Sequence, residues 1–497
     1  MKKICAIILT AFCLYAGTKA QNVDDALRYS QVFYNGTARF NGMGGAFTSL
    51  GGDISSLGQN PAGIGVFRAS ELTVTPSLFN IKTTAGFHGN STDNLSNFNL
   101  NQIGFVSNLI SNSNETGLIN LNIGYSYNKT NNMYQSVLIK GVSNTSSMAD
   151  YWAALGNQNG GTFYKDLQGA EGIAFDAYVM DTVTGSGGRK FATALSNYGD
   201  NPPSVYGQTV RRLVTNEGYI GEHDISFGGN YSNKLFFGAS LGISKLRYTS
   251  HYEHLESTDI SMPSQFKNFT YTDHYEDKGT GYSIKIGAIY KPVDAVRIGL
   301  AFHSPTWYKI DEYYYNNISA NVLGGHSEFS NPAQRFSYAL ATPYRLLAGV
   351  GVQIQKVAIL SLDYEFADYS SAKFSETGDG YDYSVKNMEI KNSLKSASNI
   401  RLGGEYRLNK LYLRAGYGYY GKAFKASEDN ANLSYNSLSF GAGFREQNIS
   451  IDFAYTYFSY SQKYFLYPVD VNVDPAVANL SAMRNLFSLT IGYKFGI

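Results

Sequence analysis

Apolar and polar residues alternate one by one over many stretches in the second half of the chain. In residues 448–458, NISIDFAYTYF, isoleucine, phenylalanine or tyrosine occupies every second position from Ile449 to Tyr457. Residues 296–302 (VRIGLAF) and 360–366 (LSLDYEF) show the same pattern. Because successive side chains of a β-strand point to opposite faces, this alternation predicts strands with one apolar face and one polar face.

The connections between these strands alternate between short and long. The short ones include REQN, RLNK, QK, KPVDA, YSNK and SNSNET, and longer segments separate them. A soluble sandwich or propeller has no reason to sort its loops in this way, whereas outer-membrane barrels have tight periplasmic turns and longer external loops. The sequence therefore predicts an all-β fold, an antiparallel transmembrane β-barrel.

The alternation and the turns predict fourteen strands, an even number that leaves both chain ends on the periplasmic side. Within 117–141, the segment NKTNN (128–132) could form a turn, which would give fifteen strands; the even count favours one long, locally irregular strand. The predicted strands are 70–88, 98–111, 117–141, 221–231, 234–256, 268–291, 295–312, 333–354, 357–375, 385–407, 410–425, 432–446, 449–466 and 483–497.

Bulk properties agree with a barrel in the outer membrane of a Gram-negative cell. The chain has 41 Tyr and 30 Phe but 2 Trp, and its net charge of +1 gives no support to a nucleic-acid partner. After residue 20 no apolar run is long enough for a membrane-spanning helix. The last strand, NLFSLTIGYKFGI, is similar to the signal read by the barrel-assembly machinery, although Gly496 and Ile497 displace the usual terminal aromatic residue.

Residues 1–20 follow the pattern of a secretory signal peptide. Two lysines precede the apolar run ICAIILTAFCLYAG, and the small residues Thr18 and Ala20 occupy the positions that a signal peptidase reads. Cleavage would make Gln21 the first residue of the mature chain. A lipoprotein start at Cys13 is the alternative, which the bulky residue before it disfavours. Both cysteines of the chain lie within this segment.

Residues 142–220 are too many for a simple loop and are expected to form a large extracellular insertion in the barrel (70–497). Two patches, SSMADYWAALG and LQGAEGIAFDAYVMDTV, have helix-like patterns. Their apolar surface must pack on itself, cap the barrel or contact a ligand. The apolar positions are Met148, Trp152, Leu155, Ile173, Phe175 and Val179.

Motifs of catalysis and of metal or nucleotide binding have simpler explanations here. GYGYYG (416–421) satisfies the dinucleotide pattern, but it lies in an alternating strand with no helix after it. His251 and His254, three apart on a strand, face opposite sides, which weakens a metal or haem site with His274. Asp363 and Glu365 share a face, as a solvated barrel lining would. We therefore expect no enzyme, no cofactor and no metal.

A fourteen-stranded lumen is wide enough to leak, because about eight strands are filled by side chains whereas 16 to 18 enclose a channel. Residues 21–69 are about the right amount of chain to fill it. The glycine-rich stretch 40–67, FNGMGGAFTSLGGDISSLGQNPAGIGVF, suits a compact and irregular segment in a narrow space. We expect residues 21–69 to form an N-terminal hatch, or plug, inside the barrel.

GMGGAFTSLGGD followed by QNPAG resembles the N-terminal region of the outer-membrane long-chain fatty acid and aromatic hydrocarbon (toluene) transporter family, the OmpP1/FadL/TodX-like group. IYKPVDAVRIGLAFHSP, ILSLDYEFADYSSAKF and IRLGGEYRLNKLYLRAGYGYY follow in order, so the resemblance covers nearly the whole mature chain. It implies a fourteen-stranded barrel with a lumenal hatch, a hydrophobic pocket above it and an exit through the wall near a kinked third strand. The insertion at 142–220 departs from the best-known members.

The resemblance implies passive capture of hydrophobic small molecules, such as long-chain fatty acids, and their lateral release into outer-membrane lipid. The alternative is a non-transporting partner in protein secretion or surface assembly; haem binding or uptake is a third hypothesis. Candidate ligand contacts are apolar residues of the glycine-rich stretch and the insertion: Phe40, Met43, Phe47, Met148, Trp152, Leu155 and Phe175. The residues expected to shape the hatch are Gly42, Gly44, Gly45, Asn60, Pro61, Ala62 and Gly63.

Overall fold

The structure, a computed structural model, describes residues 21–495 except 113–115, 159–166, 168, 186–187, 197–205, 259–265, 379, 469–470 and 472. The expected signal peptide (1–20) and the last two residues therefore lie outside the described residues. In the part of the chain that is described, no helix is long and apolar enough to cross a membrane.

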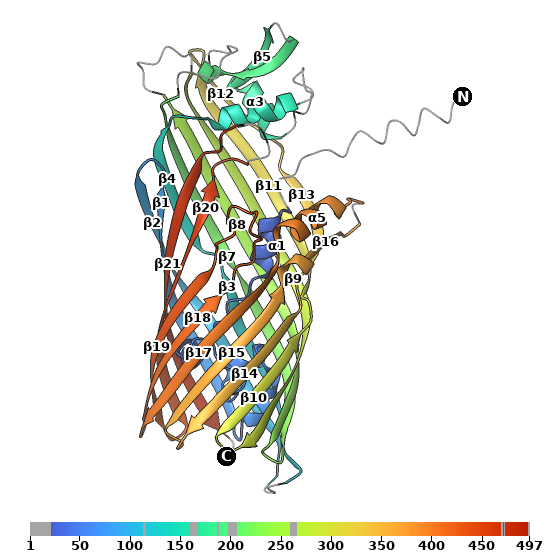
Figure 1. Cartoon of the computed structure of the whole chain (residues 1–497), viewed down its shortest axis with the longest axis vertical. Helices are drawn as coiled ribbons and strands as arrows, with labels where there is room; N and C mark the ends of the chain where they lie inside the picture. The colour runs from blue at the N-terminus through green and yellow to red at the C-terminus, as the bar shows by residue number, and fades with distance from the viewer. Residues whose placement is uncertain are drawn as a thin grey trace, which may run out of the picture.

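Nineteen strands of the described residues form one antiparallel sheet, which closes where β21 pairs with β1 (Figure 1). A separate pair, β5 (Met180–Gly185) and β6 (Gly188–Thr193), projects from the end with the long loops. The strands of the large sheet are β1 (Ser70–Gly86), β2 (Asn90–Ser111), β3 (Leu118–Asn132), β4 (Gln135–Ser143), β7 (Gln208–Tyr231), β8 (Leu235–Ser257), β9 (Phe266–Val293), β10 (Val296–His303), β11 (Trp307–Val322), β12 (Gly325–Ser330), β13 (Gln334–Ala341), β14 (Arg345–Ile354), β15 (Ala358–Asp368), β16 (Lys373–Glu376), β17 (Ser396–Leu408), β18 (Leu411–Tyr420), β19 (Tyr435–Glu446), β20 (Ile449–Phe465) and β21 (Val477–Phe495).

These strands form a closed barrel of fourteen positions, because several of them continue one another. β3 and β4 both pair with β7, and β10 and β11 both pair with β9. In the same way β12, β13 and β14 share one position, and β15 and β16 share another. The prediction of a fourteen-stranded antiparallel barrel is confirmed.

The two ends of the barrel differ as the loop lengths predict. The short turns gather at one end, called here the short-turn end, and several contain non-glycine residues with positive φ, among them Ser232 (54°) and Asn233 (57°). Paired positive φ angles suit the tight turns of hairpins, because their twist matches that of the flanking strands. The long loops lie at the opposite end, called here the long-loop end.

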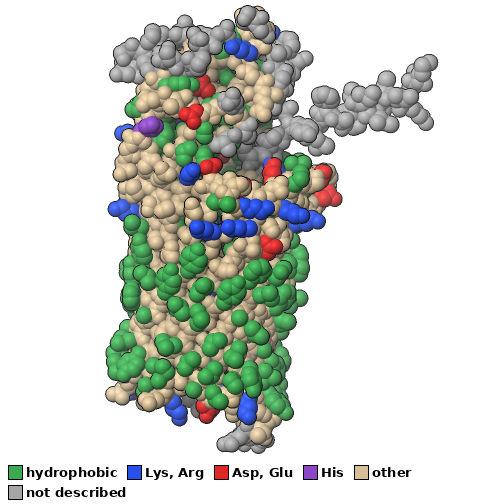
Figure 2. Space-filling view, in the orientation of Figure 1, with side chains coloured by type: hydrophobic (Ala, Val, Ile, Leu, Met, Phe, Trp, Pro, Cys, Tyr) green, Lys and Arg blue, Asp and Glu red, His purple; other side chains and the backbone are tan. Residues whose placement is uncertain are grey.

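The outer wall is apolar in a band next to the short-turn end. Figure 2 shows hydrophobic side chains spread over that part of the surface, with a row of Lys and Arg directly beyond it. On β8, Leu235, Phe237 and Leu241 are exposed within the band, and the same outward row continues as Lys245 and Arg247. Only a lipid environment makes such a continuous apolar surface favourable.

Three predicted boundaries were wrong. Residues 385–395 were expected in a strand, but α5 (Ser384–Ser393) occupies them, because SVKNMEIKNS lacks period-two alternation. β2 begins at Asn90 rather than at residue 98; its first part is polar on both faces and gave no alternating signal. β7 begins at Gln208 rather than at residue 221, so the insertion is shorter than the expected 142–220.

Residues 21–69, called here the lumenal segment, lie inside the barrel (Figure 1, blue). The segment is compact and mostly irregular, with short helices separated by turns. Gly44 (φ 63°) and Gly45 (φ 71°) adopt the left-handed conformation that favours glycine. Its helices are α1 (Val23–Ser30), α2 (Ala38–Gly42), η1 (Ile54–Gly58) and η2 (Pro61–Val66).

Buried charges on the inner wall fasten the half of the lumenal segment nearest the short-turn end. Arg39 forms two hydrogen bonds with Glu405, of 3.0 and 3.1 Å. Lys285 donates to the carbonyl oxygen of Gly58 at 2.9 Å and pairs with Asp224 at 2.9 Å. Because each removed partner would leave a buried charge unpaired, this half is strongly held.

Asp363 and Glu365 share the inner face, as the alternation predicts, but they do not form a solvated lining. Asp363 accepts hydrogen bonds from the backbone N–H (2.8 Å) and the hydroxyl (2.7 Å) of Thr48 in the lumenal segment. Glu365 accepts from Arg401 at 2.8 Å, and both side chains are fully buried. Their role is therefore to hold the segment and the wall together.

Candidate ligand-binding site

An apolar cavity of about 760 Å³, counting its part open to solvent, lies beside the lumenal segment and is called here the inner cavity. Its apolar walls include Phe33 of the lumenal segment, Phe79 of β1, Tyr420 of β18, Phe458 of β20 and Leu486 of β21. Apolar side chains of the lumenal segment and of four strands therefore meet around this space.

The polar residues of the inner cavity are asymmetric in charge. Lys129 and Arg484 line it, together with asparagines that include Asn99 and Asn101. No Asp or Glu is among the described residues that line it. One edge of an otherwise apolar space thus offers cationic donors to an anionic group.

Phe33 separates the inner cavity from a second space nearer the long-loop end. This outer space, called here the vestibule, measures about 1660 Å³ when its part open to solvent is counted, and it shares Phe33, Asn132 and Arg484 with the inner cavity. The Phe33 ring packs edge-on against Tyr420 (5.0 Å between ring centroids), Tyr435 (5.1 Å) and Phe458 (5.2 Å). Phe33, surrounded by three aromatic rings, therefore lies between the two spaces together with Asn132 and Arg484.

The barrel wall loses its hydrogen-bond ladder next to the inner cavity. β2 pairs with β3 only up to Gln102 opposite Asn128, and among the described residues its part from Asn90 to Asn101 pairs with β1 alone. Side chains span the interruption: Lys129 Nζ donates to Asn99 Oδ1 at 2.5 Å. Because Lys129 and Asn99 also line the inner cavity, the cavity reaches the interruption in the wall.

The lumenal segment is attached to the irregular part of β3. The pairing of β3 with β7 shifts register between Lys129 and Asn131, so Thr130 leaves the ladder. The Thr130 carbonyl instead accepts the backbone N–H of Phe33 at 2.7 Å, and Asn131 donates to the Arg28 carbonyl at 3.1 Å. The expectation of one long, irregular third strand is confirmed: β3 and β4 share one position, and the break falls at Met133, directly after NKTNN.

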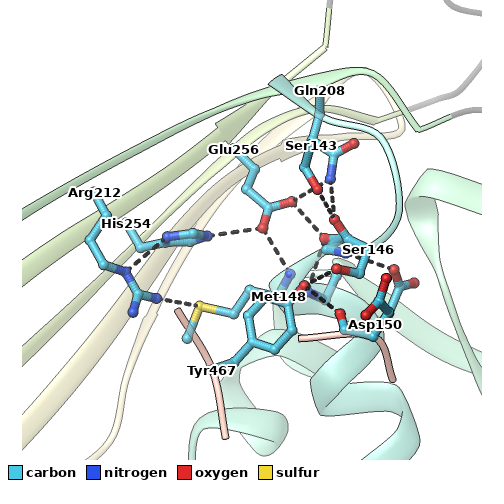
Figure 3. A network of polar contacts seen from close by, with 12 residues as sticks. Ser143, Ser146, Met148, Asp150, Gln208, Arg212, His254, Glu256 and Tyr467 are labelled. Carbon is cyan, nitrogen blue, oxygen red and sulfur yellow. Dashed lines mark hydrogen bonds and ion pairs between the residues drawn. The ribbon is translucent and has the colours of Figure 1, made fainter. Parts of the chain in front are cut away.

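The insertion packs over the long-loop end through α3 (Met148–Gln158) and α4 (Ala170–Asp176), the two helices expected there. Figure 3 shows how the start of α3 is held by β8. Glu256 accepts hydrogen bonds from the Ser147 hydroxyl (2.6 Å) and the Met148 backbone N–H (2.8 Å). These bonds fix the insertion as a cap on the barrel rim.

Two titratable groups of this network are perturbed by burial. His254 lies beyond the apolar band of β8; Arg212 donates to its Nδ1 at 3.1 Å, so its Nε2 carries the hydrogen and donates to Glu256 at 2.9 Å (Figure 3). Burial and the Arg212 charge lower the pKa of His254 to about 4. Burial raises the pKa of Asp150 in α3 to about 6.

The predicted ligand contacts of the lumenal segment lie in a core of their own. Phe40 and Phe47 stack with 5.1 Å between ring centroids and pack with Met43 and Leu50, all buried. None of the three predicted residues is among those that line the inner cavity, although Asn41, Gly44 and Gly45 beside them are. Their contact with a ligand stays a prediction.

The four predicted contacts of the insertion come together in the cap. Met148 and Trp152 are buried in its core, and Leu155 and Phe175 pack against that core. The Trp152 ring lies 5.2 Å from that of Tyr271 on the inner wall. The structure brings these residues together, but away from the cavity lining, so their contact with a ligand also stays a prediction.

The predicted hatch residues make close contacts within the lumenal segment and, at Gly42, with the wall. Asn60 caps η2 by accepting the Ala62 N–H at 3.1 Å, and it donates to the Thr48 carbonyl at 2.6 Å; Pro61 begins the helix. A Cβ atom at Gly42 would lie 3.2 Å from the Cα of Gly441. A Cβ atom at Gly63 would lie 3.0 Å from the Cα of Gly51.

Sequence reasoning missed the aromatic residues of the inner cavity, although a signal was present. Tyr420 and Phe458 occupy the inward row of their strands, directly after the outward Tyr419 and Tyr457. Phe79 follows the outward Leu78 in the same way. An aromatic residue on the polar face of an alternating strand is therefore the pattern that marks this cavity.

The histidines fall as the strand geometry predicts. His254 is buried inside the barrel, whereas His251 is exposed on the outside, opposite His274 with 6.0 Å between ring centroids. Among the described residues no group of three or more His, Cys, Asp or Glu could hold a metal ion. Residues 411–420 form strand β18, in agreement with the rejection of the nucleotide motif.

The closed barrel, its apolar outer band and its filled lumen define the class: a transmembrane β-barrel that carries its own N-terminal segment inside. Residues 226–495 match the family described as outer membrane protein transport protein (OMPP1/FadL/TodX). Because this match covers more than half of the chain, the chain belongs to that family, and its location is the outer membrane.

Individual relatives are distant. Outer membrane protein P1 of Haemophilus influenzae is 25% identical over 268 residues, which span 50% of this chain and 55% of that protein. The toluene transporter TodX of Pseudomonas putida has the same fold (TM-score 0.54, 13% identity, 94% of this chain and 100% of that one). A FadL homologue of Pseudomonas aeruginosa also shares it (TM-score 0.57, 16% identity, 94% and 100%).

Proposed function

We propose that this protein transports hydrophobic small molecules with an anionic end, long-chain fatty acids being the best-fitting class. The observation that carries the proposal is the inner cavity, which is apolar, adjoins the interrupted wall and is separated from the vestibule by Phe33. Family membership supports transport, and a relative with the same fold is named as a toluene transporter.

The cationic edge favours a carboxylate over a neutral hydrocarbon. Arg484 donates to the Tyr460 hydroxyl at 3.2 Å, and its Nε is buried without a hydrogen-bond partner. An acyl carboxylate placed there would satisfy this donor, and Lys129 stands at the same cavity. The aromatic walls would hold the first part of the acyl chain.

Release requires the site to change. Burial of an acyl chain gains about 0.8 kcal/mol per methylene, so about fourteen methylenes approach 11 kcal/mol before the costs of association. A site that binds so tightly would keep its ligand. We infer that displacement of Phe33 and the neighbouring residues loosens the site, and that the ligand leaves laterally through the interruption beside β2 into the membrane.

In this proposal the lumenal segment acts as a hatch that blocks passage toward the periplasm. Its half nearest the short-turn end stays in place through the Arg39–Glu405 and Thr48–Asp363 contacts. Residues 31–35, which adjoin both cavities, move, whereas α1 stays attached to the wall. The protein would thus exchange a hydrophobic solute with the bilayer without opening a water-filled pore.

A binding experiment in mild detergent tests the proposal. The purified barrel is first examined by mass spectrometry for co-purified molecules, and binding of radiolabelled palmitate is then compared with that of toluene. R484Q is expected to weaken palmitate binding about tenfold and to leave toluene binding unchanged, because a charged hydrogen bond contributes roughly 1.5–3 kcal/mol. R407Q, at an exposed arginine of β17, is the matched control. Equal palmitate binding by wild type and R484Q would contradict the proposal.

The second candidate function is partnership in protein secretion or surface assembly. The β5–β6 pair favours it, because this hairpin stands apart from the barrel sheet and projects beyond the rim (Figure 1). A stoichiometric protein that co-purifies with the wild type and not after deletion of 180–193 would support it. The absence of an enzymatic activity stays a prediction.

A further inference from the structure

Two buried carboxylates face each other directly across neighbouring strands. Asp277 of β9 and Glu312 of β11 are cross-strand partners, and both point into the lumen. Asp277 is fully buried and Glu312 is 2% exposed. Directly opposed like charges destabilise a sheet, and burial away from water adds to that cost.

Each of the two carboxylates keeps an oxygen atom without a partner. Asp277 Oδ2 accepts hydrogen bonds from the hydroxyls of Tyr29 (2.6 Å), Tyr275 (2.6 Å) and Tyr338 (3.0 Å), whereas its Oδ1 has none. Glu312 Oε1 is likewise buried and unpartnered. No Lys or Arg of the described residues forms an ion pair with either carboxylate. The two carboxylates are thus opposed without a cationic side chain of the described residues between them.

The first residue expected after signal-peptide cleavage lies at this pair. Gln21 is buried, and its side-chain amide donates to Glu312 Oε2 at 3.3 Å. Its position is fixed by α1, whose capping box joins Asn22 and Asp25 directly after it. Cleavage after Ala20 would create an α-ammonium group on Gln21 itself.

We propose that the carboxylates of Asp277 and Glu312 form a binding site for the α-ammonium group of the mature N-terminus at Gln21. An ammonium group has three donors, which suit the two unpartnered oxygens, and its positive charge reduces the repulsion between the opposed carboxylates. Proteolytic processing then completes the attachment of α1 to the wall, because the unprocessed chain has an amide at this position and lacks the charge.

This inference rests on the expected cleavage after Ala20 and is independent of the transported ligand. Failure of palmitate binding would leave it standing, and its own failure would leave the cavity intact. It also predicts that Gln21 keeps its free amine instead of cyclising to pyroglutamate, because an amine held by two carboxylates stays protonated and is a poor nucleophile.

The test is N-terminal labelling of the full-length protein after export and purification in mild detergent. Mass spectrometry of the N-terminal peptide follows its reaction with an amine-specific acylating reagent at pH 7.5. In the folded wild type the α-amine is expected to react at least about tenfold more slowly than in the heat-unfolded protein, as a rise of one pKa unit would produce. E312Q and D277N should both restore fast labelling without unfolding.

Matched variants separate this proposal from a general loss of structure. D311N removes the neighbouring exposed carboxylate of β11 and should keep the amine protected. Q21A removes the side-chain bond and the possibility of cyclisation, and it should also keep protection. A heat-dependent gel shift identifies folded barrels in every sample. A different N-terminus, a pyroglutamate, or equal labelling rates in wild type and both carboxylate variants would overturn the proposal.

Discussion

Two parts of the lumenal segment, residues 31–35 and residues 36–66, contact the barrel through different kinds of interaction. Residues 36–66 interlock with the barrel through buried charges and polar side chains, as Arg39 with Glu405 and Thr48 with Asp363 illustrate. Residues 31–35 instead adjoin two cavities and attach to β3 where its pairing is irregular, at Thr130. Removal of a buried charge partner is costly, whereas an aromatic contact beside empty space can reform elsewhere. We therefore infer that residues 36–66 keep the lumen closed and that residues 31–35 move.

Removal of most of the segment is expected to have the largest effect. Deletion of 22–45 takes away the aromatic plug and part of the charged anchor, so a lumen too wide for side chains alone would conduct ions. We expect single-channel conductance at least about tenfold above that of the wild type, together with altered uptake of hydrophobic solutes. Folded deletion variants with unchanged conductance and unchanged uptake would contradict the hatch hypothesis.

The charged anchor can be broken at one residue. E405A leaves Arg39 and Arg414 without their shared carboxylate, and we expect a loss of about 3–5 kcal/mol in unfolding free energy, measured by denaturant titration in detergent. E446A removes the exposed partner of Lys410 and should cost at most about 1 kcal/mol. Similar losses of unfolding free energy in E405A and E446A would contradict the expectation that the buried ion pairs of Glu405 stabilise the barrel more than an exposed ion pair does.

The variant F33A tests residues 31–35, the part of the lumenal segment that is expected to move. Loss of the ring joins the vestibule to the inner cavity, and bound palmitate should exchange roughly tenfold faster, a change of about 1.4 kcal/mol in the barrier. The measurement is displacement of labelled palmitate by stopped flow. F440A, at an exposed phenylalanine of the lipid-facing wall, should leave the exchange rate unchanged. A slower exchange in F33A would assign the ring a role other than closure.

The smallest expected effect lies in the cap. Burial raises the pKa of Asp150 to about 6 from 3.8, so between these values the folded protein holds a proton that the unfolded chain releases. The contribution of Asp150 to stability is therefore present at low pH and is lost as pH rises through this window. The melting temperature of D150N minus that of the wild type should increase from pH 4 to pH 7, whereas D176N, at an exposed aspartate, should show a flat difference. The His254 contribution is common to these proteins and cancels.

The barrel itself could be predicted because its strands and turns are determined by residues that are close together in the sequence. The alternation of apolar and polar residues determines which side chains face lipid. Short turns such as YSNK then determine the register of the two strands that they join. The start of β2 escaped prediction, because its polar residues face no apolar environment on either side. Residues 385–395 were misread as a strand although SVKNMEIKNS lacks period-two alternation.

The site could be predicted only in outline. A lumen of fourteen strands requires a filling, and the glycine-rich stretch supplied a candidate for it. The inner cavity, however, combines Phe33 of the lumenal segment with Tyr420, Phe458 and Arg484, which lie on three different strands. These residues meet only after closure of the barrel. The pattern along a single strand does not show that these residues lie close together in space. The inward aromatic residues were nevertheless visible as exceptions to the alternation.

The central claim is that residues 31–35 move during transport while residues 36–66 stay fixed. Both native cysteines precede Gln21, so engineered disulfides in the processed chain are unambiguous. A disulfide in F33C/T130C would lock residues 31–35 to β3, because the backbones of Phe33 and Thr130 are hydrogen-bonded. A disulfide in S49C/S361C would lock residues 36–66 to β15, because the two serine hydroxyls lie 3.4 Å apart.

Fatty acid uptake by cells that carry each pair is measured before and after reduction. The account predicts that oxidised F33C/T130C takes up palmitate at the background rate and recovers on reduction, whereas S49C/S361C transports equally in both states. Undiminished uptake by fully oxidised F33C/T130C would contradict it.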